Sequence, residues 1–181
     1  GLYSCYAAKS RECKVYSFEP SVFNLELLSK NIFINSLADK IVIIPFPITD
    51  KLSVNTFNMS STEWGDALST FGENLNTKEK NKSNIFHYKM IGMSMNNCAD
   101  LLNVEKPNHI KIDVDGIEHL VLKDSQKILE GAESILIEID TSVKNQEADI
   151  QKYLLAAGFN LKENQKSQVG FKNLFNQIWI K

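Results

Sequence analysis

The sequence contains almost no arginine. Of its 20 basic residues only Arg11 is an arginine, and the others are lysines. A site in which several forked guanidinium groups grip phosphates is therefore excluded. The 22 acidic residues outnumber the basic ones and give a net charge of −2. A general nucleic-acid binder shows a basic stripe on one face, so this balance argues against that class of protein.

Cysteine is also scarce, and long apolar runs do not occur in the sequence. The three cysteines, Cys5, Cys13 and Cys98, form no Cys-x-x-Cys pair and no spacing typical of metal ligands. No run approaches the roughly 18 apolar residues that cross a membrane. The sequence does not open on a charged segment followed by an apolar one. We therefore predict structural thiols, a reducing cytoplasmic setting and no membrane partner.

The remaining composition is that of an ordinary globular protein, with 43% hydrophobic and 23% charged residues. A chain of 181 residues suits a single domain with a sizeable core. Helical and strand-like patterns alternate along it, which predicts an α/β fold with a doubly wound, mostly parallel sheet. Helices are expected over 1–10, 21–36, 98–103, 117–129 and 146–157, strands over 14–19, 40–46, 87–94, 109–114 and 134–140, and a closing antiparallel pair over 159–165 and 176–180.

Residues 50–90 interrupt this alternation. Asn, Ser, Thr and Lys dominate the segment, and its apolar side chains are isolated. Within it, residues 78–84 have the composition of a solvated loop. The segment is too poor in apolar residues to form a core of its own. We therefore predict one domain over 1–181, with a variable loop or hairpin excursion at 50–90.

The most informative stretch runs from His109 to Glu118. Apolar residues at 110, 112 and 114 alternate with polar ones, so the two kinds lie on opposite faces of a strand. Asp113 and Asp115 fall at the carboxyl end of that strand, directly before a helix. Ligands bind at this edge of open α/β sheets. A strand that ends in an acidic turn without a function is the alternative.

Three patterns in this order resemble the FkbM family of S-adenosylmethionine-dependent methyltransferases. The first is PheGluPro at 18–20 within residues 15–35, the second is LysIleAspValAspGlyIleGlu at 111–118, and the third is SerIleLeuIleGluIle at 134–139. The second is similar to the family's Lys-Ile-Asp-x-Glu-Gly-x-Glu run. The resemblance implies a Rossmann-like methyltransferase sheet with a C-terminal antiparallel strand pair, S-adenosylmethionine as cofactor and a small-molecule acceptor.

The resemblance also implies which residues contact the cofactor: Gly1, Leu2, Glu19, Pro20, Ile48 and Asp113. Glu19 ends the family's second strand, where a carboxylate accepts hydrogen bonds from the two ribose hydroxyls. Ile48 follows the third strand and would lie near the adenine ring. Asp113 would face the methionine end of the cofactor or the acceptor.

The sequence departs from the family at its start. Family members open on an apolar strand and a glycine-rich turn, and Gly1 corresponds to the last glycine of that turn. The first strand would lie between the strands at 14–19 and 109–114. We therefore expect an N-terminally truncated domain in which these two strands have unpaired edges. In addition, Asp140 stands where the family favours a histidine.

Methyl transfer to a hydroxyl group also requires removal of a proton. A carboxylate within hydrogen-bond reach can take it. By position the candidates are Asp113, Asp115, Glu118, Glu138 and Asp140, and we favour Asp113 first and Glu138 second as catalytic residues. The predicted reaction is O-methylation of a sugar or another small hydroxylated metabolite.

Several alternatives stay open from the sequence. One alternative to a methyltransferase is a non-catalytic Rossmann-like domain that binds a nucleotide-bearing ligand. Another is an inactive fragment. The same carboxylates suit Mg²⁺ or Ca²⁺, although we predict no metal. A homo-oligomer is open as well, since an unpaired strand edge offers pairing to a second chain.

Overall fold

The computed structural model describes residues 1–67, 69–72, 85–167 and 173–181. Its elements in chain order are α1 (Leu2–Ser10), β1 (Val15–Phe18), α2 (Val22–Ile34), β2 (Ile41–Ile44), β3 (Ser53–Met59), β4 (Thr70–Phe71), β5 (Phe86–Gly92), α3 (Met95–Leu102), β6 (His109–Ile112), α4 (Glu118–Lys123), α5 (Gln126–Leu129), β7 (Ser134–Asp140), α6 (Gln146–Ala156), β8 (Asn160–Lys166) and β9 (Leu174–Ile180). The predicted helices and strands are confirmed, with bounds shifted by a few residues, except the helix over 117–129. The solvated loop predicted at 78–84 lies outside the described residues.

The helix predicted over 117–129 is wrong because the chain breaks between α4 and α5. The carboxylate of Asp124 accepts hydrogen bonds from the Ser94 hydroxyl and, at 2.6 Å, from the Asn96 amide. The hydroxyl of Ser125 donates to the carbonyl of Leu122. Short polar side chains that bond in this way compete with the helical backbone pattern. The result is two short helices instead of one.

The strands form three separate sheets, in the orders β1-β2, β4-β3-β5 and β6-β7-β9-β8. The pairs β1·β2 and β6·β7 are parallel. The pairs within β4-β3-β5 and the pairs β7·β9 and β8·β9 are antiparallel. The expected C-terminal antiparallel pair is therefore confirmed. The doubly wound, mostly parallel arrangement is not confirmed: β1 and β6 are unpaired, as predicted, and the excursion forms an antiparallel sheet of its own.

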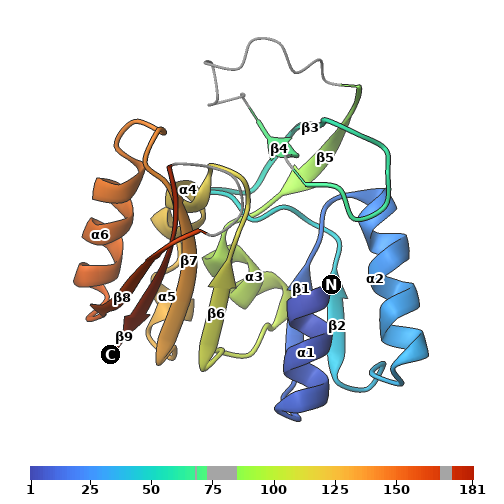
Figure 1. The fold of residues 1–181 in the computed structure, drawn as a ribbon, viewed down its shortest axis with the longest axis horizontal. Helices are drawn as coiled ribbons and strands as arrows, with labels where there is room; N and C mark the ends of the chain where they lie inside the picture. The colour runs from blue at the N-terminus through green and yellow to red at the C-terminus, as the bar shows by residue number, and fades with distance from the viewer. Residues whose placement is uncertain (68, 73–84, 168–172) are drawn as a thin grey trace.

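Within the described residues, β1 and β6 are edge strands that do not pair with each other, as predicted. Side chains connect the two halves. Lys14 forms an ion pair with Glu105 at 2.5 Å, and the backbone N–H of Glu105 lies 3.5 Å from the Tyr16 hydroxyl. The ammonium group of Lys111 lies 5.1 Å from the centre of the Tyr3 ring on α1. Figure 1 shows α1 packed beside β1 and β2, with β6 next to them.

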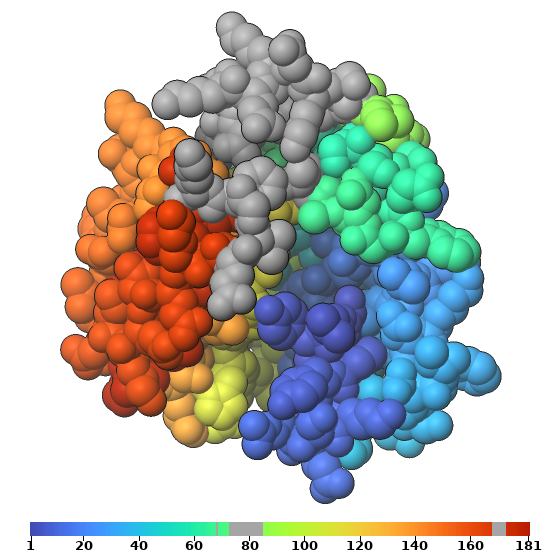
Figure 2. Space-filling view, in the orientation of Figure 1, coloured from blue at the N-terminus to red at the C-terminus, as the bar shows by residue number. Residues whose placement is uncertain are grey.

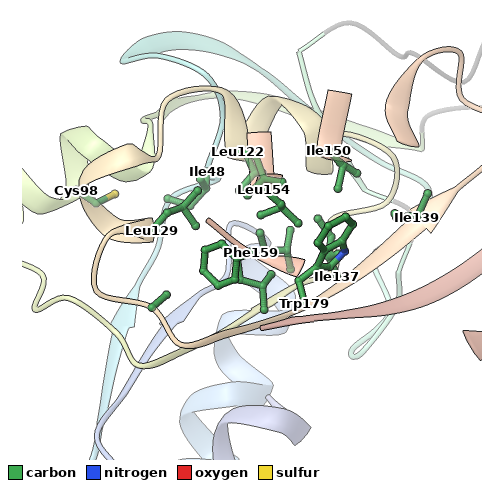
Figure 3. Close-up of a cluster of buried hydrophobic side chains, with 14 of the residues drawn as sticks. Ile48, Cys98, Leu122, Leu129, Ile137, Ile139, Ile150, Leu154, Phe159 and Trp179 are labelled. Carbon is green, nitrogen blue, oxygen red and sulfur yellow. The ribbon is translucent and has the colours of Figure 1, made fainter. Parts of the chain in front are cut away.

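The largest core cluster lies where α4, α5 and α6 cover β6, β7 and β9 (Figure 3). On β7 the residues Ile135, Ile137 and Ile139 are fully buried, so alternation along the strand fills the core. Leu154 of α6 and Trp179 of β9 pack against them. A second cluster, formed by Ala8, Leu28, Ile32, Leu37 and Ile41, lies under α1 and α2.

The three cysteines are free thiols. Cys98 is buried in the largest core cluster, where burial raises the pKa of its thiol to about 11. Cys5 packs against the second cluster, while the exposed Cys13 thiol lies 3.3 Å from the Ala7 carbonyl and donates to it. A raised pKa and burial make Cys98 a packing residue rather than a nucleophile.

In the part of the chain that the structure describes, none of the helices has both the length and the apolar character of a membrane span.

Candidate functional site

The carboxyl ends of the parallel strands carry the predicted site residues. Glu19 follows β1, Asp113 follows β6, and Glu138 lies near the end of β7. Figure 1 shows β6 and β7 running toward the same end of the molecule, where the β4-β3-β5 sheet also lies. The surface is hollowed between α1 and the C-terminal strands, and the β6 region lies deeper than α1 there (Figure 2).

The parallel register that pairs Ile112 with Ile137 makes Asp113 and Glu138 the next neighbours at the ends of β6 and β7. Burial, together with the charge of Asp113 and the hydrogen bond to it, raises the pKa of Glu138 to about 7. Lys111 opposes this shift, and its ammonium group lies 2.7 Å from the Asp113 carboxylate. A carboxyl group that titrates near neutrality takes up and releases a proton readily at physiological pH. The pair is therefore suited to general acid–base chemistry.

Glu118 is a further carboxylate beneath this pair and is 2% exposed. Its Oε1 accepts from the backbone N–H groups of Val114 at 3.1 Å and Gly116 at 3.3 Å. Its Oε2 accepts from the side-chain amide of Gln146 at 2.7 Å. The carbonyl oxygen of the Gln146 side chain in turn accepts from the backbone N–H of Asp140 at 2.7 Å.

The sequence placed Glu118 among the candidate carboxylates but gave no reason to single out Gln146. The two residues are 28 positions apart, and a glutamine in the first turn of a helix carries no local signal. Only the packing of α6 against α4 brings its amide to Glu118.

Glu118 should make the stability of the fold depend on pH. Burial raises its pKa to about 7 from an ordinary value of 4.5, although backbone hydrogen bonds oppose the shift. Between these two pH values the folded state keeps a proton that the unfolded state has released. The free energy of unfolding should therefore fall as pH rises through this window, on the order of 3 kcal/mol in total.

Urea unfolding between pH 4 and pH 8 measures this effect. Glu118→Gln should remove the part of the slope that Glu118 contributes and leave the part from Glu138, whose pKa is also raised to about 7, while Glu26→Gln, at an exposed position on α2, should leave the curve unchanged. An equally steep curve for Glu118→Gln would assign the pH dependence to other groups.

Glu19 lies in the turn between β1 and α2. Its carboxylate accepts from the backbone N–H of Ser21 at 2.9 Å. Burial raises the pKa of Glu19, while that hydrogen bond and the nearby amino group of Gly1 lower it. The structure therefore brings Gly1 and Glu19 together, as the predicted cofactor contacts require.

Tyr88 of β5 supports the same turn and was not predicted. Its hydroxyl donates to the carbonyl of Pro20 at 2.9 Å and lies 3.4 Å from the backbone N–H of Val22. Its ring packs against Phe57 and Phe86. The β4-β3-β5 sheet thus supports the Glu19–Pro20 turn through the Tyr88 hydroxyl.

The remaining predicted contacts differ in their surroundings. An added Cβ on Gly1 would meet the end of the Leu28 side chain, Cδ1, at 2.5 Å, so α1 begins in close contact with α2. Leu2 is exposed and free to contact a ligand. Ile48 is buried in the largest core cluster and bridges to Met93, so only its backbone is near the surface of a site. Its contact with the adenine ring stays a prediction.

A metal site does not emerge from the geometry. Among the residues that the structure describes, no group of three or more His, Cys, Asp or Glu side chains is arranged to hold a metal ion.

Comparison with known proteins identifies a family over most of the chain. The sequence model of the methyltransferase FkbM domain matches residues 1–161. A crystal structure of methyltransferase FkbM from Methylobacillus flagellatus KT is similar, with a TM-score of 0.59 and 12% identity, over 93% of this chain and 36% of that chain. This likeness shows a shared mixed α/β fold, and the chain spans little more than a third of that relative's length.

A second solved structure is a precorrin-6y C5,15-methyltransferase from Geobacter metallireducens GS-15. It has a TM-score of 0.45 and 9% identity, over 93% of this chain and 66% of that chain. The search of curated proteins found no match.

Proposed function

Since the match over residues 1–161 makes this chain a member of the methyltransferase FkbM domain family, we propose that it transfers a methyl group from S-adenosylmethionine to a hydroxyl group. The acceptor is a sugar or another small hydroxylated metabolite. The observation that carries the proposal is the Asp113–Glu138 pair, in which the pKa of Glu138 is raised to about 7. A hydroxyl acceptor needs a base of this kind, because its proton must leave as the new bond to carbon forms.

The cofactor would lie across the ends of β1 and β6. Glu19, which is buried beside the amino end of α1, would accept hydrogen bonds from the ribose hydroxyls. Gly1, Leu2 and Pro20 would line the same position. S-adenosylmethionine supplies a methyl group on a sulfonium that is already activated for displacement. The protein has to align the two reactants, exclude water and hold a proton acceptor near the hydroxyl.

Asp113 is the first proton acceptor in this proposal and Glu138 the second. Asp113 is the more exposed partner, is ion-paired to Lys111 and would face the acceptor. The proton that Asp113 takes from the hydroxyl would pass to Glu138 when Glu138 is ionised, and the raised pKa of Glu138 favours this transfer. The two carboxyl groups then act as one proton-accepting unit.

Calorimetric titration with S-adenosylhomocysteine tests the cofactor. A dissociation constant on the order of 1–100 μM would support the proposal. A folded chain that does not bind would contradict it. Incubation with radiolabelled S-adenosylmethionine and a panel of mono- and disaccharides then tests transfer. Binding without transfer to any hydroxyl compound would favour the non-catalytic nucleotide-binding domain.

Glu19→Ala should weaken S-adenosylhomocysteine binding by about 1.5–3 kcal/mol, because charged hydrogen bonds to the ribose are lost. Calorimetry on the folded variant measures the change. Glu26→Ala is the matched control, since this α2 glutamate is exposed and pairs with Lys30 one turn away. An affinity of Glu19→Ala equal to that of the control would remove Glu19 from the cofactor site.

A further inference from the structure

We propose that Glu118 and Gln146 are positioning residues, whose buried hydrogen bonds hold the carboxyl ends of β6 and β7 in the register that brings Asp113 and Glu138 together. The inference deepens the proposed function and rests on it, because the pair matters for catalysis only if the chain transfers methyl groups. Neither residue reaches the acceptor itself, since both are almost completely buried.

The first half of this connection is the turn after β6. Asp115 adopts a left-handed conformation with φ 57°, and Gly116 follows with φ 108°. A residue other than glycine reaches the left-handed region only at a cost, so the turn needs support from its surroundings. The Glu118 carboxylate supplies it by accepting from the backbone N–H groups of Val114 and Gly116. Asp113 directly precedes this turn, so the conformation of the turn sets the position of Asp113.

The second half is the end of β7. Gln146 is 0% exposed and uses both ends of its side-chain amide. It donates to Glu118 and accepts from the backbone N–H of Asp140, each at 2.7 Å. Asp140 is two residues after Glu138 on the same strand, so both side chains leave the same face of β7. One buried amide thus ties the end of β7 to the turn after β6.

Because these hydrogen bonds are buried, the loss of one partner has a structural cost. Water cannot replace a lost partner in this position, so a missing partner leaves Glu118 or the Asp140 backbone unsatisfied. The strand ends then shift until the groups find other partners. Such a shift separates Asp113 from Glu138 before it unfolds the sheet, because the strands themselves remain paired along their length.

Gln146→Leu breaks the connection at similar side-chain volume. We expect the titration midpoint of Glu138, followed by carbon-13 NMR of its carboxyl, to fall by about one pH unit or more as Asp113 moves away. Lys111 and Glu118 are the other charged groups that face Glu138. Methyl transfer should fall by about tenfold or more, with S-adenosylhomocysteine affinity within about twofold of the unsubstituted chain. A purely structural contribution would lower stability without moving this midpoint.

Two further variants complete the test. Gln151→Leu is the matched control on α6, because its amide lies near the surface and reaches only Glu147 at 3.5 Å. The double variant Glu118→Gln, Gln146→Glu exchanges the two side chains. Residue 118 then donates and residue 146 accepts, so the hydrogen bond between them is kept. The double variant should recover at least about a third of the transfer rate lost in Gln146→Leu, because the hydrogen bonds re-form.

The inference and the proposed function fail separately. A folded Gln146→Leu variant with an unchanged Glu138 midpoint overturns the inference, whether or not the unsubstituted chain transfers methyl groups. A shifted midpoint in a chain that binds no S-adenosylhomocysteine and transfers no methyl group supports the connection but overturns the proposed function. A Glu138 midpoint near 4.5 in the unsubstituted chain would also overturn the inference, since the two carboxyl groups would then not be held together.

Discussion

Asp113→Asn should lower the rate of methyl transfer by about 10²–10⁴-fold while leaving the affinity for S-adenosylhomocysteine nearly unchanged. The substitution keeps the shape of the side chain but removes the proton acceptor. It also removes a charge and a hydrogen bond that raise the pKa of Glu138. The midpoint of Glu138 should consequently fall in the same variant, which NMR titration of its carboxyl measures.

Asp100→Asn serves as the control for that experiment. Asp100 lies on α3, is exposed, and pairs with Lys127 at the surface. The control should keep both the rate and the affinity of the unsubstituted chain. If Asp113→Asn lost affinity and rate in equal proportion, Asp113 would be a cofactor-binding residue and the base would have to be sought elsewhere.

Leu154→Ala should have the largest effect on stability, about 2–5 kcal/mol. Leu154 is fully buried in the largest core cluster, where α6 covers β7. The truncation removes apolar contacts and leaves a cavity that the surrounding isoleucines fill only in part. Urea unfolding at fixed pH, with the slope compared between variants, gives the change in the free energy of unfolding.

The neighbouring Leu155 provides a control of identical chemistry. Its side chain is 58% exposed on the same helix, so Leu155→Ala should change stability by no more than about 0.5 kcal/mol. Equal losses from both substitutions would mean that the contribution comes from helix propensity rather than from burial. A much smaller loss for Leu154→Ala would mean that α6 moves in to fill the cavity.

Local periodicity explains why so many elements could be predicted. The alternation in Ser134–Asp140 gives a strand with one apolar face, and β7 occupies those residues with that face buried. Pro20 before a polar-apolar helical pattern marks the start of α2, where Ser21 accepts from the backbone N–H of Asn24. Such signals depend only on residues that are close in sequence, so they can be read without knowledge of the tertiary structure.

Features set by distant residues could not be predicted in the same way. The break after α4 follows from Ser94 and Asn96, which reach Asp124 across about 30 positions. Periodicity identifies a strand but not its partner, so the antiparallel β4-β3-β5 sheet could be expected only as a loop or hairpin excursion. At the site, the nearness of Asp113 to Glu138 follows from adjacent parallel strand ends, whereas the link through Gln146 depends on how α6 packs. The catalytic and cofactor contacts themselves stay predictions.

The core clusters have a consequence for how the protein opens. A third cluster, formed by Phe57, Met59, Phe71 and Ile117, packs against Phe23 of α2 on one side and against Val114 after β6 on the other. No backbone ladder joins β1 to β6 among the described residues, so this cluster and the Ile48–Met93 bridge connect the Glu19 end to the Asp113 end. Local unfolding of the β4-β3-β5 sheet should therefore disturb Glu19 and Asp113 together.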